Sequence, residues 1–411
     1  MGTNHARQGL SDKLVASASG LSEELVRLRR RLHREPELGL HLPRTQEAVL
    51  DALDGLPLEL TTGTATTSVT AVLRGAHPGP TVLLRGDMDA LAVVEKLPSD
   101  FRSTNGAMHA CGHDLHTAML VGAAHLLAER RESLAGNVVF MFQPGEEGYN
   151  GAGVMLAEGV LSAAGEPPAA AYALHVLSSR LPAGTFASRT GQLMAAAGKL
   201  QVTVVGAGGH GSAPHSAADP IPAMCEMVTA LQTFITRSFD VFDPVVLSVG
   251  SIHAGTAHNV IPESGAFEAS IRTFSEAAGE KALEGCVRVV RGIAAAHGLT
   301  AEVVAEPLFP PTLNHDAETV RAQECVAELF GIERWRDLAN PLTGSEDFSR
   351  VLQQAPGAMV FLGAHAPGAD FRSAPFNHSP EAAFDDGLLA DGAALYTGPR
   401  SSGCFGLTVR F

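Results

Sequence analysis

The chain has 411 residues, of which 45% are hydrophobic and 18% are charged, and its formal net charge at pH 7 is −15. Such a length predicts two domains, because a single hydrophobic core seldom grows beyond about 300 residues. The excess of acidic residues argues against nucleic acid or an anionic membrane surface as a partner. The sequence contains no run of about 18 apolar residues that would predict a membrane span. Its five cysteines are scattered and form no Cys-x-x-Cys motif, which favours a reducing, cytoplasmic location.

The first predicted elements are two helices and two strands. Residues up to about Ser19 are expected to form a disordered leader, and leucines at helical spacing then predict a helix from Leu21 to Leu32. A second helix is predicted after Pro43. Two β-branched runs, 67–73 and 81–84, predict strands that are separated by a turn rich in glycine and proline.

Two acids, Asp87 and Asp89, follow the second strand. Open α/β sheets place their chemistry at the carboxyl ends of strands, so these acids are candidates for a site. We expect only one of them to aim directly at it and favour Asp89. The alternative is an ordinary acid in a turn.

The stretch from Met108 to Thr117 is dense in metal-ligand side chains. It contains His109, Cys111, His113 and His116. Thiolate and imidazole groups suit Zn²⁺ or Mn²⁺, and the glycine between Cys111 and His113 lets the backbone bend so that both point to one place. The alternative is a buried thiol beside surface histidines, which is the commoner meaning of an isolated Cys-x-His.

Two further strands end in residues of the same kind. A helix is predicted from Asp114 to Arg130, and the apolar run 137–143 that follows it predicts a buried strand leading to Glu146 and Glu147. Another apolar strand, 169–175, ends at His175. Helices alternating with strands that end in metal-ligand residues predict a doubly wound sheet with a metal site in its crevice.

From about residue 188 the pattern changes to β-α-β-β-α-β, which describes a ferredoxin-like insert. Its predicted elements are 199–205, 220–238, 245–253, 265–273, 276–297 and 299–306. A linker at 307–311 leads back to the first domain, where helices 317–330 and 385–396 flank a strand at 358–363. Residues 398–411 fit no predicted element.

Seven motifs occur in order between residues 21 and 396. They are Arg85-Gly-Asp-Met-Asp-Ala, Met108-His-Ala-Cys-Gly-His-Asp, Phe142-Gln-Pro-Gly-Glu-Glu, Ala173-Leu-His, Gly208-Gly-His, Asn259-Val-Ile-Pro and Gly344-Ser-Glu-Asp-Phe. Together they resemble the metallo-amidohydrolases of the aminoacylase and carboxypeptidase G superfamily, and most of all the branch of hippurate hydrolase and the plant auxin-conjugate (IAA-amino acid) hydrolases. The chain departs from the usual family pattern at Ala92, Gly145 and Gly198, which bears on the shape of the substrate.

The resemblance implies a zinc-exopeptidase-like α/β fold, in which a doubly wound mixed sheet carries an inserted ferredoxin-like α+β lid. The catalytic metal-binding domain would comprise residues 1–187 and 307–411. The lid, residues 188–306, would also form a homodimer interface.

The resemblance also implies two divalent metal ions per subunit, Zn²⁺ or Mn²⁺, with Co²⁺ or Ni²⁺ as other candidates. The implied metal ligands are Cys111, His113, Glu147, His175 and His378. Glu146 would be the general base, and Asp89 would orient a ligand. His210 of the lid would reach the scissile carbonyl of the neighbouring subunit, and Asn259 with Arg272 would hold the substrate carboxylate.

The implied activity is hydrolysis of the amide bond of an N-acyl amino acid of the acetyl, benzoyl or arylacetyl type. A dipeptidase or carboxypeptidase would use the same metals but would need a pocket for a free substrate amine. A binding protein with a dead site is a third alternative, and the presence of all five ligands and the base argues against it.

Overall fold

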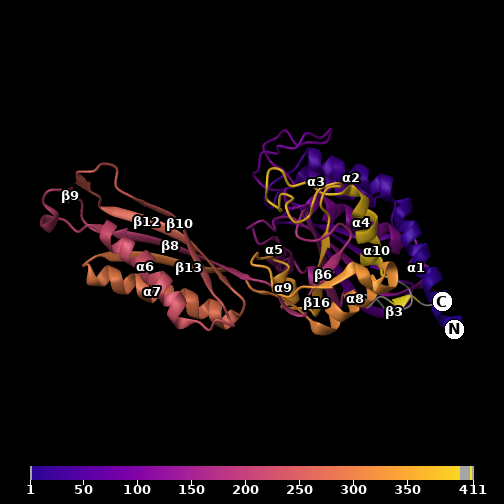
Figure 1. Cartoon of the computed structure of the whole chain (residues 1–411). Helices are drawn as coiled ribbons and strands as arrows, with labels where there is room; N and C mark the ends of the chain where they lie inside the picture. Colours follow the sequence, from indigo (N-terminus) through magenta and orange to yellow (C-terminus); the bar gives the residue numbers. More distant parts are fainter. Residues whose placement is uncertain (1, 399–407, 410–411) are drawn as a thin grey trace. The chain divides into compact units, whose positions relative to one another are not determined.

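The computed structural model describes residues 2–398 and 408–409, and the chain divides into two compact units (Figure 1). Unit 1 comprises Met1–Leu193, Leu313–Asn340 and Arg350–Phe411, and unit 2 comprises Met194–Thr312 and Pro341–Ser349. Unit 2 therefore begins and ends later than the predicted lid, 188–306. The predicted first residue of the lid, 188, lies in strand β6 (Phe186–Ser188) of the unit 1 sheet. The predicted linker at 307–311 overlaps the end of strand β13 (Thr300–Phe309), which is an edge strand and therefore tolerates Pro307.

A mixed nine-stranded sheet forms the centre of unit 1. Its order is β1-β2-β4-β3-β5-β16-β6-β15, with β17 also paired to β4. The neighbours β4, β3, β5 and β16 run parallel, whereas β1 and β2 are antiparallel to their partners, and β6 is antiparallel to β16 but parallel to β15. The strands are β1 (Leu58–Thr62), β2 (Val69–Arg74), β3 (His77–Asp87), β4 (Leu134–Gln143), β5 (Ala170–Leu177), β6 (Phe186–Ser188), β15 (Trp335–Asp337), β16 (Gly357–Gly363) and β17 (Thr408–Val409).

Helices cover this sheet, and α4 is the most deeply buried of them. Its helical residues from His113 to Ala124 are all buried, because it packs against β3 on one side and against α2 and α10 on the other. The helices of unit 1 are α1 (Gly2–Gly20), α2 (Ser22–Arg34), α3 (Pro43–Leu53), α4 (His113–Ala128), α5 (Gly151–Ala157), α8 (Asp316–Phe330) and α10 (Leu389–Thr397), with short 3-10 helices η1 (Arg131–Ser133), η2 (Val160–Ser162), η4 (Ile332–Arg334) and η5 (Asp386–Leu388). The short helix α9 (Ser349–Leu352) begins at the last residue of unit 2.

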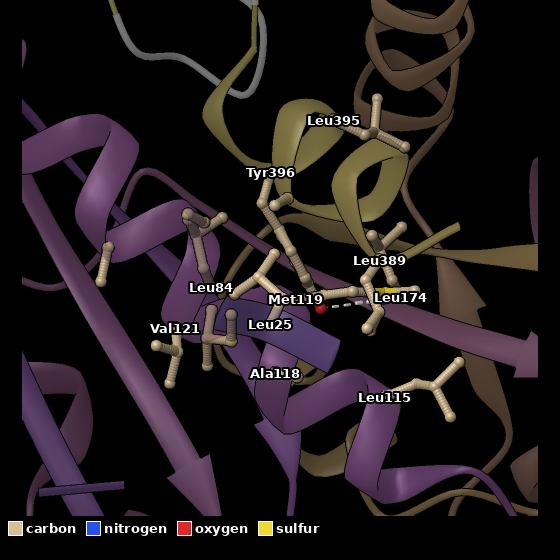
Figure 2. Packing of buried hydrophobic residues seen from close by; sticks show 14 of the residues in the cluster. Leu25, Leu84, Leu115, Ala118, Met119, Val121, Leu174, Leu389, Leu395 and Tyr396 are labelled. Atoms are coloured by element: carbon tan, nitrogen blue, oxygen red, sulfur yellow. Dashed lines mark hydrogen bonds between the residues drawn. The ribbon is translucent and has the colours of Figure 1, made fainter. Parts of the chain in front are cut away.

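One buried hydroxyl connects α10 to the strands below it. Figure 2 shows Tyr396 among the leucines of the core, with its oxygen pointing to Leu174. The Tyr396 hydroxyl accepts the backbone N–H of Leu174 at 2.7 Å and donates to the carbonyl of Arg85 at 2.5 Å. Because β3 and β5 are neighbours, this single side chain fixes the last helix over the strands that carry the candidate site.

The predicted disordered leader is wrong, because residues 2–20 form helix α1. Leu14 and Ala18, four residues apart, are buried and pack into the core of unit 1. Cys111, Cys225 and Cys286 are free thiols, whereas Cys325 is disulfide-bonded, which the predicted reducing location does not favour. Cys404 lies outside the described residues.

Unit 2 contains a four-stranded antiparallel sheet with the order β10-β12-β8-β13, covered on one face by helices α6 and α7. The element order is the predicted β-α-β-β-α-β. The elements are β8 (Ala196–Val205), β9 (Gly209–His210), η3 (Pro214–Ser216), α6 (Pro220–Ser238), β10 (Val246–Ala254), β11 (Val260–Ile261), β12 (Ser264–Thr273), α7 (Glu276–Ala296) and β13 (Thr300–Phe309). Strands β7 (Gly191–Met194) and β14 (Thr312–Asn314) form a separate ladder. The expected α/β fold with an inserted α+β domain is confirmed.

None of the described helices is both long and apolar enough to cross a membrane.

Candidate metal centre

The candidate ligands gather where three adjacent parallel strands end. Strands β4, β3 and β5 are neighbours in the sheet and run in the same direction, so their carboxyl ends meet. Glu146 and Glu147 follow β4, and His175 lies near the end of β5. All of these residues belong to unit 1.

Cys111 and His113 flank the start of α4. Gly112, the residue before the helix, has a φ of 87°, in the left-handed region that favours glycine. A Cβ added at Gly112 would lie 2.4 Å from Cγ2 of Val176. The predicted role of this glycine follows from both facts, because only glycine allows the sharp bend and the close approach to β5 that aim both ligands at one place.

Asp89 holds the backbone of the two glutamates. One of its carboxylate oxygens accepts the N–H of Glu146 and the other accepts the N–H of Glu147, each at 3.0 Å. The preceding Gly145 has a φ of 72°, and a Cβ there would lie 2.5 Å from Cδ2 of Leu40. The turn that presents the two acids therefore depends on glycine at 145 and on the fully buried Asp89 carboxylate.

Two of the histidines have their ring orientation set by backbone carbonyls. The Nδ1 atom of His113 lies 2.9 Å from the carbonyl oxygen of Asp89, and Nδ1 of His175 lies 2.9 Å from that of Val176. With Nδ1 donating, the neutral ring presents the lone pair of Nε2 to the site. The Nε2 atom of His113 is buried without a hydrogen bond to the described residues, as expected of a ligand atom.

The fifth candidate, His378, comes from the loop between β16 and α10. Its φ of 73° is uncommon for a residue with a side chain, and its backbone N–H donates to the carbonyl of Ala110 at 2.9 Å. The Nε2 atom of His378 lies 3.1 Å from Oε1 of Glu147. The preceding Asn377 donates to the carbonyls of Cys111 and Val176, so the loop is fixed to both sides of the site.

The donor atoms form two sets that could each hold an ion. One set is Cys111, His113 and His175, and the other is Cys111, Glu147 and His378, with the atoms of each set within 4.8 Å of one another. Glu146 and Glu147 form a third such group with His113. Thiolate, imidazole and carboxylate donors at these separations fit zinc or a similar divalent ion. Cys111 belongs to both sets and would therefore contribute to holding an ion in either of them.

The charges around the donors also favour a cation. Burial alone would lower the pKa of His113, but Asp87 and the Cys111 thiolate raise it well above its usual range. Hydrogen bonds to Cys111 and Glu147 raise the pKa of His378 to about 10. The group of donors thus stabilises positive charge at this position, which a bound metal ion would supply in place of the protons.

The expectation that only one of the two acids after β3 aims at the site is wrong. Asp89 contacts His113 and the two glutamates, and Oδ2 of Asp87 lies 3.4 Å from Nε2 of His113. Residues i and i+2 of an extended chain share a face, so both acids reach the same histidine. Asp87 is itself held by Arg85 at 2.6 Å.

His116 lies beside the site, but both of its ring nitrogens are already used. Its Nδ1 atom is 2.6 Å from Asp87, and its Nε2 atom accepts the N–H of Val176 at 2.8 Å. His116 therefore supports β5 next to His175 and is not available as a ligand. The sequence pattern predicts neither this function nor that of Asn377, whose only local signal is its position before His378.

The three predicted residues of unit 2 lie in two places. His210 in β9 pairs with Val260 in β11, and the N–H of Gly211 donates to the carbonyl of Asn259 at 2.8 Å, so His210 and Asn259 are close together and exposed. Arg272 lies near the other end of β12, opposite Ala197. The structure therefore brings His210 and Asn259 together within unit 2 but separates both from Arg272.

Comparison with known proteins gives consistent results. Residues 83–398 match peptidase family M20/M25/M40. The chain is 35% identical to thermostable carboxypeptidase 1 of Saccharolobus solfataricus over 94% of this chain and 97% of that protein. It is 35% identical to the IAA-amino acid hydrolase ILR1-like 4 of Arabidopsis thaliana over 93% and 86%. The crystal structure of the Bacillus subtilis YXEP protein, described as a dinuclear metal binding peptidase, matches with a TM-score of 0.78 and 31% identity over 92% of this chain and 97% of that one.

Proposed function

Because the chain belongs to peptidase family M20/M25/M40, we propose that this hydrolase cleaves the amide bond of N-acyl amino acids and releases a carboxylic acid and a free amino acid. The observation that carries the proposal is the pair of donor sets sharing Cys111, with the carboxylate of Glu146 beside them. The name of the Arabidopsis relative, an IAA-amino acid hydrolase, supports an acyl amino acid as the substrate.

The residues that would hold two divalent ions are the five at which the donor atoms converge. They are Cys111, His113, Glu147, His175 and His378. Zn²⁺ or Mn²⁺ suits this mixture of sulfur, nitrogen and oxygen donors, and Co²⁺ or Ni²⁺ would also be accepted. Such ions, when bound, polarise the amide carbonyl and lower the pKa of water toward neutrality.

Glu146 is the residue we assign to proton transfer. Its neighbour Glu147 faces His378, and the hydrogen bonds from their backbone N–H groups to Asp89 fix the turn that carries both side chains. A carboxylate in this position takes a proton from the attacking water and returns it to the leaving nitrogen. Asp89 acts on the reaction only through the two glutamates and His113.

The lid residues of this proposal require a homodimer. Asn259 lies in the turn next to Ser264, the first residue of β12, and Arg272 lies near the other end of this strand. At the usual rise of a strand, Ser264 and Arg272 are about 27 Å apart. One substrate carboxylate cannot contact both residues of the same subunit over such a distance. We therefore assign His210 and Asn259 to the site of a neighbouring subunit, with His210 donating to the scissile carbonyl, and propose that Arg272 contacts the substrate separately from these two residues.

A carboxypeptidase or dipeptidase is the second candidate, and the similarity to thermostable carboxypeptidase 1 favours it. One assay separates the two. Metal-depleted protein is reconstituted with Zn²⁺ or Mn²⁺ and offered acetyl, benzoyl and indoleacetyl amino acids alongside dipeptides with the same C-terminal residue. Higher kcat/KM for the acylated substrates supports the proposal, and a preference for the free amine of the dipeptides contradicts it.

A further inference from the structure

Arg180 carries an exposed positive charge on the loop that follows β5. Its guanidinium carbon lies 3.8 Å from the centroid of the Phe376 ring, so the flat group lies on the ring face. Phe376 stands two residues before the candidate ligand His378. This cation–π contact holds the guanidinium on the ring of Phe376.

The loop of Arg180 is joined to the loop of His378 by several hydrogen bonds. Asn377 accepts the N–H of Ser178 at 3.0 Å, and the Ser178 hydroxyl donates to the carbonyl of Pro375 at 2.8 Å. The amide nitrogen of the same Asn377 lies 3.8 Å from Sγ of Cys111. Arg180 is therefore connected to a metal-ligand sulfur through Phe376 and the adjacent Asn377.

The backbone of Arg180 is unusual in the same way as that of His378. Its φ is 70°, a left-handed conformation that residues with side chains seldom adopt, and its N–H donates to the carbonyl of Phe371 at 2.7 Å. Such conformations persist only where the surrounding structure imposes them, and they are concentrated at functional sites. The conformation places the Arg180 side chain on Phe376.

The charge of Arg180 is not neutralised by the part of the chain that the structure describes. No carboxylate of residues 2–398 forms an ion pair with it. Arg334 also stacks on a phenylalanine, Phe330, but pairs with Asp391 at 2.8 Å. In a chain with a net charge of −15, an arginine held flat and without an acid is arranged to bind an anion from outside.

We propose that Arg180 binds a second carboxylate of the substrate, remote from the scissile amide, and so makes N-acyl derivatives of acidic amino acids preferred substrates. The α-carboxylate is attached to the carbon next to the scissile nitrogen and must lie close to the donor atoms. Arg180 contacts Phe376, two residues before His378, and no donor atom, so the carboxylate that we assign to it is the one further from the scissile nitrogen. The inference rests on the proposed function for its substrate class.

The test compares N-acetyl-L-glutamate with N-acetyl-L-glutamine, which differ only in the distal group. The wild-type enzyme should show the higher kcat/KM for the glutamate derivative. Arg180→Gln should lower kcat/KM for that substrate about 10- to 100-fold, the usual effect of losing a charge-assisted hydrogen bond, and leave the glutamine derivative unchanged. Arg180→Lys should recover part of the preference, because the charge remains while the planar fork is lost.

Arg372 supplies the matched control. It is an exposed arginine of the loop that carries Phe376 and His378, and it lies over Phe371 at 4.9 Å, so Arg372→Gln also removes a positive charge that contacts a phenylalanine ring. This variant should keep the preference for glutamate. If kcat/KM for the glutamate derivative fell equally in both variants, the two arginines would attract anions only in a general way, and the assignment would be overturned. An equal loss for both substrates in Arg180→Gln would also overturn it, because the side chain would then only position the His378 loop.

Calorimetric binding of L-glutamate and L-glutamine separates a failure of this inference from a failure of the proposed function. Neither amino acid contains an amide bond that the proposed reaction would cleave, so binding can be measured even if no acyl amino acid is hydrolysed. Tighter binding of glutamate to the wild-type protein than to Arg180→Gln supports the inference by itself. Equal binding to both proteins contradicts it, whatever the hydrolysis assay gives.

Discussion

The Sγ atom of Cys111 lies 3.4 Å from the Nε2 atom of His175. Zinc bonds of about 2.3 Å to sulfur and about 2.0 Å to nitrogen place two such ligands at this separation in a tetrahedral site. A thiolate that ligates a metal is protected from alkylation. We therefore expect iodoacetamide to leave Cys111 unmodified in the metal-loaded protein and to label it after chelation, as measured by peptide mass mapping.

Two other cysteines are internal controls for this labelling. Cys225 is exposed and should react in both states. Cys286 is buried, which raises the pKa of its thiol to about 12, so it should react in neither. Equal labelling of Cys111 with and without metal would remove it from the ligand set.

Replacing Asp89 tests the support of the two glutamates. In Asp89→Asn one of the two carboxylate oxygens that accept N–H groups becomes an amide donor, so the turn at Glu146 and Glu147 loses an acceptor. Loss of such an outer contact typically weakens metal affinity about 10- to 100-fold. Competition with a chelator of known affinity measures this change.

Glu158 offers a matched control on the surface. Its carboxylate accepts the N–H groups of Thr64 and Ala65 at 2.8 and 2.7 Å, away from the donor atoms. Glu158→Gln neutralises a carboxylate that likewise accepts two backbone N–H groups, and it should leave metal affinity unchanged. If both variants weaken metal binding equally, the effect of Asp89 is one of general stability.

A site residue could be predicted from the sequence where the pattern that marks it lies in the residues next to it. Each of the strand-end ligands follows or closes an apolar strand, and strand ends in an α/β sheet meet in space, so His175 and Glu147 could be identified without coordinates. His378 has no such strand before it and was found only through the resemblance to a family.

The missed features have partners that are distant in sequence. Arg29 of helix α2 is buried and contacts Asp114 at 2.8 Å and Asp386 at 2.9 Å. Asn377 is likewise defined by contacts with Cys111 and Val176. No periodicity or spacing reveals such pairs, because they depend on how separate elements pack. The three-residue strands β6 and β15 were missed because they are too short to show a pattern.

Subunit mixing tests the assignment of His210. Glu146→Gln and His210→Ala should each be inactive alone. When the two are mixed in equal amounts and exchange subunits, half of the dimers carry one site with both residues intact, so about a quarter of wild-type activity should return. Mass spectrometry of differently labelled subunits verifies the exchange. No recovery after demonstrated exchange would mean that His210 does not act across an interface.

The most direct test of the account compares kcat and metal content in Glu146→Gln and Glu147→Gln. Glu146 is assigned to proton transfer and its neighbour to metal binding, so Glu146→Gln should retain two ions per subunit by plasma mass spectrometry while its kcat falls about 10²- to 10⁴-fold. Glu147→Gln should instead lose metal. Near-wild-type kcat in Glu146→Gln with both ions bound would contradict the account.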